Sequence, residues 1–92
     1  MVYAAKCFWP EVEETELQRV AERAHADVGS DRVSYLGSIC FPSDDLVLCL
    51  FDAPSPVAVK RASERLRIPC ERVMPALWIP QLGPQTSARC AR

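Results

Sequence analysis

The feature that most constrains the fold is a pair of apolar runs separated by a turn sequence. Residues 33–41 (VSYLGSICF) and 46–52 (LVLCLFD) are rich in β-branched, aromatic and aliphatic residues, and PSDD lies between them. Proline, serine and aspartate favour tight turns. We therefore predict a β-hairpin in which Phe41 pairs with Leu46.

A strand-like run and an amphipathic segment precede the hairpin. Residues 2–9 (VYAAKCFW) are mostly apolar and are followed by Pro10, which cannot donate a hydrogen bond to a sheet. The next segment can begin with a capping box of Thr15 and Gln18. Its apolar residues recur at helical spacing, at Leu17, Val20, Ala21, Ala24 and Val28. The sequence therefore predicts a strand and then a helix.

A second helix and a fourth strand follow the hairpin. Ser55 can cap the helix with Pro56 at its first position, and the helix must end before Pro69 because proline disfavours helical geometry in the residue that precedes it. Residues 70–79 (CERVMPALWI) resemble a strand, which Pro75 confines to a sheet edge or a bulge. The order βαββαβ predicts an α+β fold, a ferredoxin-like sandwich with two helices on one face of a four-stranded antiparallel sheet.

Length and composition fit one small domain. The chain has 92 residues, of which 49% are apolar and 25% are charged. We expect residues 1–80 to form a single ferredoxin-like domain and residues 81–92 to form a C-terminal tail or arm. The longest apolar run is far shorter than the roughly 20 residues that span a membrane, and the N-terminus lacks the pattern of a secretion signal. We therefore expect a cytoplasmic protein with no membrane partner.

Strand alternation predicts which side chains face the helices. In the hairpin we place the more apolar alternate set under the helices, namely Val33, Tyr35, Gly37, Ile39, Phe41, Leu46, Leu48 and Leu50. The other set then faces outward, namely Leu36, Ser38, Cys40, Val47, Cys49 and Phe51. A glycine at position 37 would indicate close approach of a helix or an aromatic ring. Lysine is rarely buried in a core, so Lys6 is also placed on the open face.

An uncovered apolar sheet face requires a partner. We expect a homodimer or larger oligomer that pairs through this face and encloses a shared cavity. The candidate ligand-binding residues of that cavity are Lys6, Ser38, Cys40 and Cys49. The same cavity would suit a small ligand or a metal ion.

Thiols and one imidazole suggest a metal site. The candidate metal ligands are Cys40, Cys49 and His25, because thiolate and imidazole together suit nickel, copper or zinc. A closed site takes about four ligands, so a second subunit would supply the rest. The five cysteines of the chain show no CxxC spacing. The alternative interpretation is that Cys40 and Cys49 are small apolar residues and that His25 is structural.

Two further function classes are alternatives to a binding protein. One is a small cofactor-free enzyme of the cyclase, isomerase or monooxygenase type, acting in the dimer cavity with Lys6, Cys40 or Cys49 near the substrate; the sequence shows no nucleophile with an adjacent base. The other is a structural interaction module. RNA-binding domains can share the βαββαβ order, and the chain has basic residues between Lys60 and Arg72. Residues 45–52 lack the basic and aromatic pattern of such sheets, so no nucleic-acid partner is predicted.

Several segments resemble a known family. YAAKCFWPEV, YLGS, CLFDAPS and RIPCERV, together with the order of elements, are similar to a family of small bacterial ferredoxin-like proteins of undefined function that includes a nickel-binding protein. The resemblance covers most of residues 3–79. At two positions where members typically carry glutamate, this chain has Lys6 and Pro75. The resemblance implies the ferredoxin-like fold and binding of nickel or another divalent transition metal, and it assigns no ligand residue.

Overall fold

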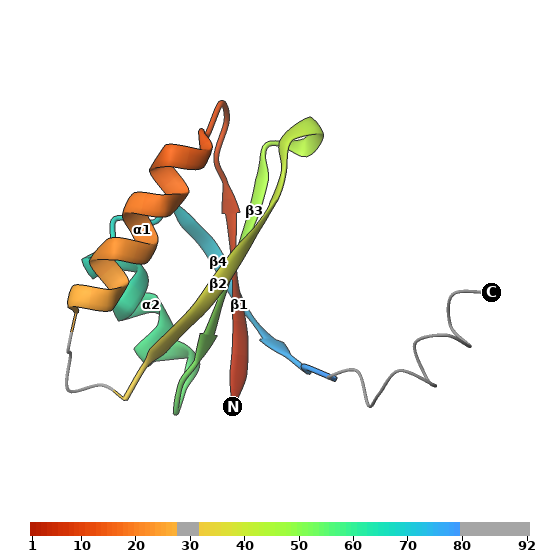
Figure 1. The fold of residues 1–92 in the computed structure, drawn as a ribbon. Helices are drawn as coiled ribbons and strands as arrows, with labels where there is room; N and C mark the ends of the chain where they lie inside the picture. The colour runs from red at the N-terminus through yellow and green to blue at the C-terminus, as the bar shows by residue number, and fades with distance from the viewer. Residues whose placement is uncertain (28–31, 80–92) are drawn as a thin grey trace, which may run out of the picture.

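Strands and helices alternate along the chain as the sequence predicts (Figure 1). The computed structural model describes residues 1–27 and 32–79. In these ranges the elements are β1 (Val2–Phe8), α1 (Glu14–Ala26), β2 (Ser34–Phe41), the short 3₁₀ turn η1 (Pro42–Asp44), β3 (Leu46–Asp52), α2 (Pro56–Arg65) and β4 (Cys70–Ala76). Val28 of the predicted helical pattern and the C-terminal arm predicted for 81–92 lie outside the described residues.

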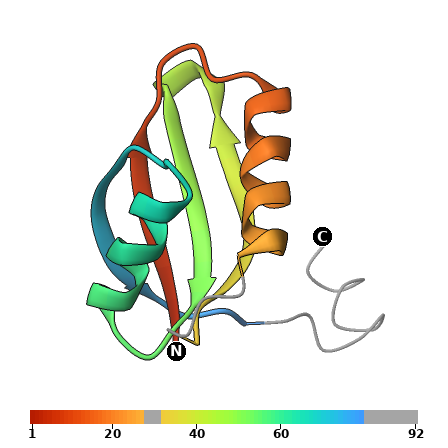
Figure 2. The ribbon, with the colours of Figure 1, turned by 90° about the vertical axis from the view of Figure 1, so that its left-hand side faces the viewer.

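The four strands form one antiparallel sheet in the order β2-β3-β1-β4. Both helices lie on the same side of it, which Figure 2 shows from the helix side. The predicted ferredoxin-like α+β fold is confirmed. β4 is an edge strand, as Pro75 requires. In residues 1–27 and 32–79, neither helix has the length and apolar character needed to cross a membrane.

The helix ends are held by specific hydrogen bonds. The Ser55 hydroxyl accepts from the backbone nitrogen of Ala58 at 3.2 Å, which confirms the predicted cap of α2. α1 starts earlier than predicted, because its capping box uses Glu13 and Glu16 instead of Thr15 and Gln18. The backbone nitrogen of Glu13 donates to Glu16 Oε1 at 3.1 Å.

The hairpin pairing is confirmed, with one irregularity. Phe41 pairs with Leu46 in the described register. The register shifts between Tyr35 and Gly37, and Gly37 has a φ of 139°, which only glycine adopts readily. The bulge turns Tyr35 toward the helix side, where its ring contacts that of Phe51 with centroids 5.6 Å apart.

The predicted assignment of the two hairpin faces is wrong from Gly37 to Phe51, whereas Val33 and Tyr35, on the other side of the bulge, pack against the core as predicted. Val47, Cys49 and Phe51 are 0% exposed and pack in the core with helix residues such as Val20 and Val59. Ile39 and Phe41 lie on the other side and are 46% and 41% exposed. The predicted close approach at Gly37 is also wrong, because a Cβ built there meets nothing within 4 Å.

The physical reason for the reversal is the register of β3 against β1, in which Lys6 pairs with Leu48. Because a lysine is costly to bury under the helices, the residues that share its face, Leu48 and Ile39 among them, point to the open side. The alternate residues of β3 then pack against the buried residues of α2, which are Ala58, Val59, Ala62 and Ser63. On β1 the prediction holds, since Tyr3, Ala5 and Cys7 are buried under the helices and Lys6 pairs with Leu48 on the open side.

Candidate functional site

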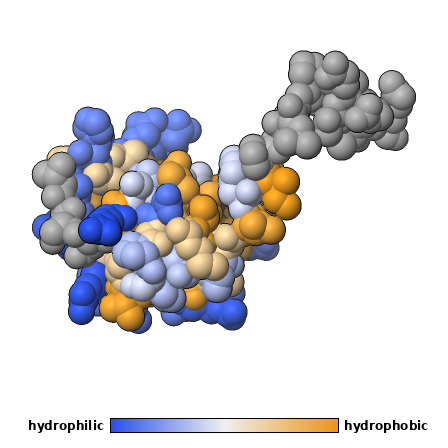
Figure 3. Space-filling view, turned by 90° about the horizontal axis from the view of Figure 1, so that it is seen from below, coloured by the Kyte–Doolittle hydropathy of each residue, from blue (hydrophilic) through white to orange (hydrophobic). Residues whose placement is uncertain are grey.

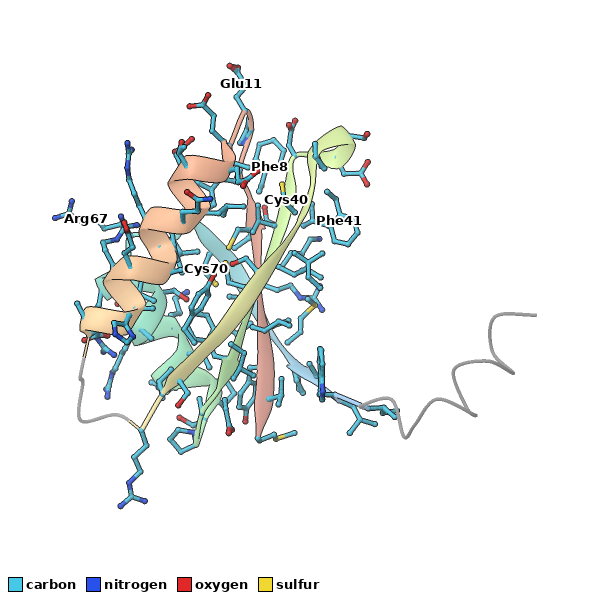
Figure 4. The ribbon with its side chains drawn as sticks, in the orientation of Figure 1. Phe8, Glu11, Cys40, Phe41, Arg67 and Cys70 are labelled. Atoms are coloured by element: carbon cyan, nitrogen blue, oxygen red, sulfur yellow. The ribbon has the colours of Figure 1, made fainter. Side chains whose placement is uncertain are left out.

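The open face of the sheet carries large apolar side chains that no described element covers. We define this surface as the alternate residues of the four strands that point away from the helices. Direct register pairs join them across the sheet, and its apolar members are Phe8, Ile39, Phe41, Leu46, Leu48, Leu50 and Met74. Phe8, at the end of β1, is 56% exposed. In Figure 4, Phe41 and Cys70 lie on opposite sides of the sheet.

Two cations lie side by side within this apolar surface. Lys6 on β1 is the direct register partner of Arg72 on β4, and on its other flank Lys6 pairs with Leu48. Lys6 is half-buried and Arg72 is exposed. Within residues 1–27 and 32–79, the ion pairs are Met1 with Asp52 and Arg65 with Asp27, so neither cation of the open face has a carboxylate partner there.

A second group of polar atoms lies on the helix side of the sheet. The hydroxyl of Ser38 donates to Cys49 Sγ at 3.2 Å, and it shares a short hydrogen bond with the hydroxyl of Tyr35. Cys7 and Cys49 are both fully buried. The polar groups of this side therefore follow one another across the sheet, from the hydroxyls of Tyr35 and Ser38 on the edge strand β2 to the thiols of Cys49 on β3 and Cys7 on β1.

These contacts shift the titration of the two thiols in opposite directions. The hydrogen bond from Cys7 lowers the pKa of Cys49 against the effect of its burial, and Ser38 lowers it further. The pKa of Cys7 is raised by that same hydrogen bond and then by burial. Burial also raises the pKa of Cys70 and of Tyr35. Cys49 is thus the thiol whose pKa is lowered, with Ser38 donating to it, while the Cys7 thiol donates to the backbone oxygen of Ala5 at 3.5 Å.

Cys40 and His25 lie at separate hollows of the surface. Cys40 lines a pocket of about 260 Å³ with Trp9 and Asp45, between the β1–α1 connection and the β2–β3 turn. His25 lines a groove of about 370 Å³ between α1 and the start of β2. Neither hollow contains the fully buried Cys49.

The predicted site residues are therefore divided between two faces. Cys49 lies on the helix side with Ser38, and the register pair of Cys40 with the buried Val47 places Cys40 there too. Lys6 is on the open face as predicted, but it is not brought together with the thiols. The cavity that was predicted to combine Lys6 with Cys40 and Cys49 does not form in one subunit.

Two residues of these sites were missed by the sequence reasoning. Cys7 is the partner of Cys49, and the alternation of β1 already placed it on the helix side. Arg72 is the partner of Lys6. Its position in β4 alternates with Met74, but the register of β4 against β1 cannot be read from either strand alone.

Comparison with known proteins places the chain in a family. Residues 6–75 match the model of a family described as nickel responsive protein SCO4226-like. The chain belongs to this family. The resemblance drawn from the sequence is thereby confirmed. A comparison with curated proteins found no match.

A solved structure of the SCO4226-like family supports the fold. The crystal structure of SCO4226 from Streptomyces coelicolor A3(2) superimposes with a TM-score of 0.75 at 16% sequence identity. The match covers 87% of this chain and 100% of that chain. At this level of identity the similarity establishes the shared ferredoxin-like architecture.

The description of the SCO4226-like family names nickel, so the described residues must be compared with the ligands that a metal ion requires. Among residues 1–27 and 32–79, no group of three or more histidine, cysteine, aspartate or glutamate side chains is arranged to hold one. Cys40, Cys49 and His25 lie in three different surroundings. Near its centre the open face adds apolar side chains and the cations Lys6 and Arg72, which repel a divalent metal, and its carboxylate Asp52 is at the end of β3 and bound to the ammonium of Met1. The described residues of one subunit therefore do not fit a nickel site.

Proposed function

We propose that this protein is a homodimeric binding protein whose two open faces pair and enclose a small ligand. The observation that carries this proposal is the exposed apolar surface formed by Phe8, Ile39 and Phe41 with their neighbours across the sheet. Contiguous apolar surface of this kind on a small domain marks an interaction site. The family to which the chain belongs is described as nickel responsive, and the ligand-binding role is our inference from the face itself.

The open face of the sheet supplies part of the area that pairing with a second copy requires. Strands of seven or eight residues and a sheet of four strands give a projected area of about 450 Å², from about 3.3 Å per residue and about 4.8 Å between strands. A standard interface buries about 800 Å² on each partner. The sheet alone therefore supplies roughly half of what a stable dimer needs.

The segment after β4 can supply much of the remaining area. Leu77, Trp78 and Ile79 are all largely exposed. Figure 1 shows the chain leaving β4 on the side away from the helices, and Figure 3 shows hydrophobic residues in orange around that point. Under two-fold symmetry each copy would place this segment against the rim of the other copy's open face. Both copies would then cover apolar surface that is otherwise exposed.

The experiment is sedimentation equilibrium of the full chain. We expect a dimer at micromolar concentration. Ile39→Lys adds a cation to a face that already carries Lys6 and Arg72 and should give a monomer, because like charges repel and an unpaired charge is costly to bury. The matched control is Val57→Lys on α2, where the side chain is 58% exposed on the helix side, and this variant should remain a dimer. A parent chain that is monomeric at these concentrations would contradict the proposal.

Nickel binding is a second candidate function, favoured by the family description. Because three described ligands do not converge in one subunit, a nickel site would need side chains from more than one copy or from outside the described ranges. Elemental analysis of untagged protein dialysed against nickel measures this directly. If the first proposal is right and nickel is not the ligand, bound nickel stays well below one per dimer. Stoichiometric nickel would support the second candidate.

A further inference from the structure

The two cations of the open face create an electrostatic problem for a dimer. Lys6 and Arg72 are direct register partners across β1 and β4, so their side chains leave the sheet next to each other. Their flanking positions on this face are apolar, with Leu48 beside Lys6 and Met74 one pair further along β4. Glu71, which precedes Arg72, lies at the register shift between Lys6 and Cys7 and is exposed.

No carboxylate of the described residues neutralises the pair. Asp52 is at the far end of β3 and is bound by the N-terminal ammonium of Met1 at 2.9 Å. Asp27 pairs with Arg65 on the helix side. When a second copy covers the open face, Lys6 and Arg72 lose water without gaining a partner from their own subunit. A two-fold axis through the face also brings the same two cations of the other copy toward them.

We propose that the cavity between the paired open faces binds a small organic anion, with an apolar body against the sheet and a carboxylate held by Lys6 and Arg72. This inference rests on the proposed dimer and names the class of its ligand. A guanidinium can hold a carboxylate through two parallel hydrogen bonds, and the ammonium adds a point charge. The apolar body contacts the side chains that flank the pair, such as Leu48 beside Lys6 and Met74 on β4.

If the anion binds between the two copies, its affinity and the dimer dissociation constant must depend on each other, and both can be measured. An anion that neutralises the cations stabilises the paired state, so it must tighten the dimer by the same factor by which the dimer tightens the anion. A neutral molecule of the same shape fills the apolar space but leaves the charges unpaired. The charge of the ligand, and not its apolar surface, should therefore control dimerisation.

The experiment uses 2-naphthoate and its uncharged isostere 2-naphthalenemethanol with the full chain. Binding is followed by ligand fluorescence, and the dimer dissociation constant is followed by sedimentation equilibrium. We expect 2-naphthoate to lower the dimer dissociation constant at least tenfold and the alcohol to change it less than twofold. Equal effects of the two probes would overturn the inference, because apolar filling alone would then explain binding.

Three variants assign the effect to the pair. Lys6→Gln and Arg72→Gln should each weaken 2-naphthoate binding at least tenfold and should strengthen the dimer when no anion is present, because they remove repulsion. Arg61→Gln, on the exposed side of α2, is the matched control and should behave as the parent. Unchanged binding in both open-face variants would overturn the anion site. A monomer under all conditions that still binds 2-naphthoate through this pair would reject the dimer and keep the site.

Discussion

The two faces of the sheet are built from different kinds of side chain. The helix-covered face is buried and, apart from Tyr3 and Phe51 toward one end, carries small or medium residues such as Ala5, Cys7 and Val47. The open face carries larger residues that remain partly exposed, such as Ile39 and Phe41, with the cations Lys6 and Arg72 among them. Large apolar side chains therefore lie outside the domain core as well as within it. We infer that the first face stabilises the fold and that the second serves binding.

Thiols suit the covered face because they are small and only weakly polar. Cys7 and Cys49 occupy positions beneath helices whose buried residues are mainly alanine, valine and serine. Leucine or phenylalanine at the same positions would overpack this layer. Packing thus explains why cysteines occupy positions 7 and 49. Burial and hydrogen bonding, including that from Ser38, explain why the pKa values of the two thiols are shifted.

The largest contrast between the faces is expected from two phenylalanine truncations. Phe51→Ala opens a cavity in the core and should lower the free energy of unfolding by about 3–5 kcal/mol. Phe41→Ala removes a 41% exposed ring and should cost the isolated subunit only about 0.5 kcal/mol. Urea unfolding at two protein concentrations measures both variants.

Concentration dependence separates the two roles of these rings. Phe41→Ala should reduce the part of the stability that rises with protein concentration, because that part comes from pairing of the open faces. Phe51→Leu is a milder variant for the case in which Phe51→Ala does not fold. A loss for Phe41→Ala as large as that for Phe51→Ala at low concentration would contradict the distinction between the faces.

The elements of the fold were predictable because each has a local signal. Pro56 after Ser55 marks the start of α2, and Pro75 confines β4 to an edge. The hairpin pairs, such as Phe41 with Leu46, follow from the turn sequence between two runs of clear length. These signals act over a few residues and do not depend on what packs against them.

The choice of face was not predictable from the hairpin alone. The rule that apolar residues lie inside does not exclude apolar residues from an outer interface, and here the more apolar set of the hairpin is outside. Lys6 gave the correct side for β1, and its register with Leu48 would have corrected the hairpin. That register is a tertiary property, because neither strand encodes which residue of the other it meets. The pairing of Lys6 with Arg72 was hidden for the same reason.

A smaller loss of stability is expected when Gly37 is replaced, because this residue is required for its backbone conformation and not for core packing. Its φ of 139° is unfavourable for any residue with a Cβ. We expect Gly37→Ala to lower the free energy of unfolding by about 1–3 kcal/mol. Nothing lies within 4 Å of the added Cβ, so Gly37→Leu, whose side chain is not branched at Cβ, should cost about as much as Gly37→Ala in thermal unfolding. A much lower melting temperature for the leucine variant would show that packing, and not φ, requires the glycine.

The smallest effect is the pH dependence that the covered face should confer. Below pH 9, the lowered pKa of Cys49 means that the folded chain holds fewer protons than the unfolded chain, so stability rises slightly with pH. Above pH 9, the unfolded chain releases protons that the folded chain retains on Cys7 and Cys70, whose pKa values are raised. Stability should then fall, by up to about 1.4 kcal/mol per pH unit for each group.

Urea unfolding from pH 7 to pH 10 should therefore show a shallow maximum near pH 9. Cys49→Ala removes the group with the lowered pKa and the hydrogen-bond partner of Cys7, so the rise below the maximum should disappear and the fall above it should become less steep. Cys40→Ala removes a thiol outside this network and should keep both limbs of the profile. A profile of Cys49→Ala that matches the parent would mean that the paired thiols do not couple folding to pH, and that the covered face serves packing alone.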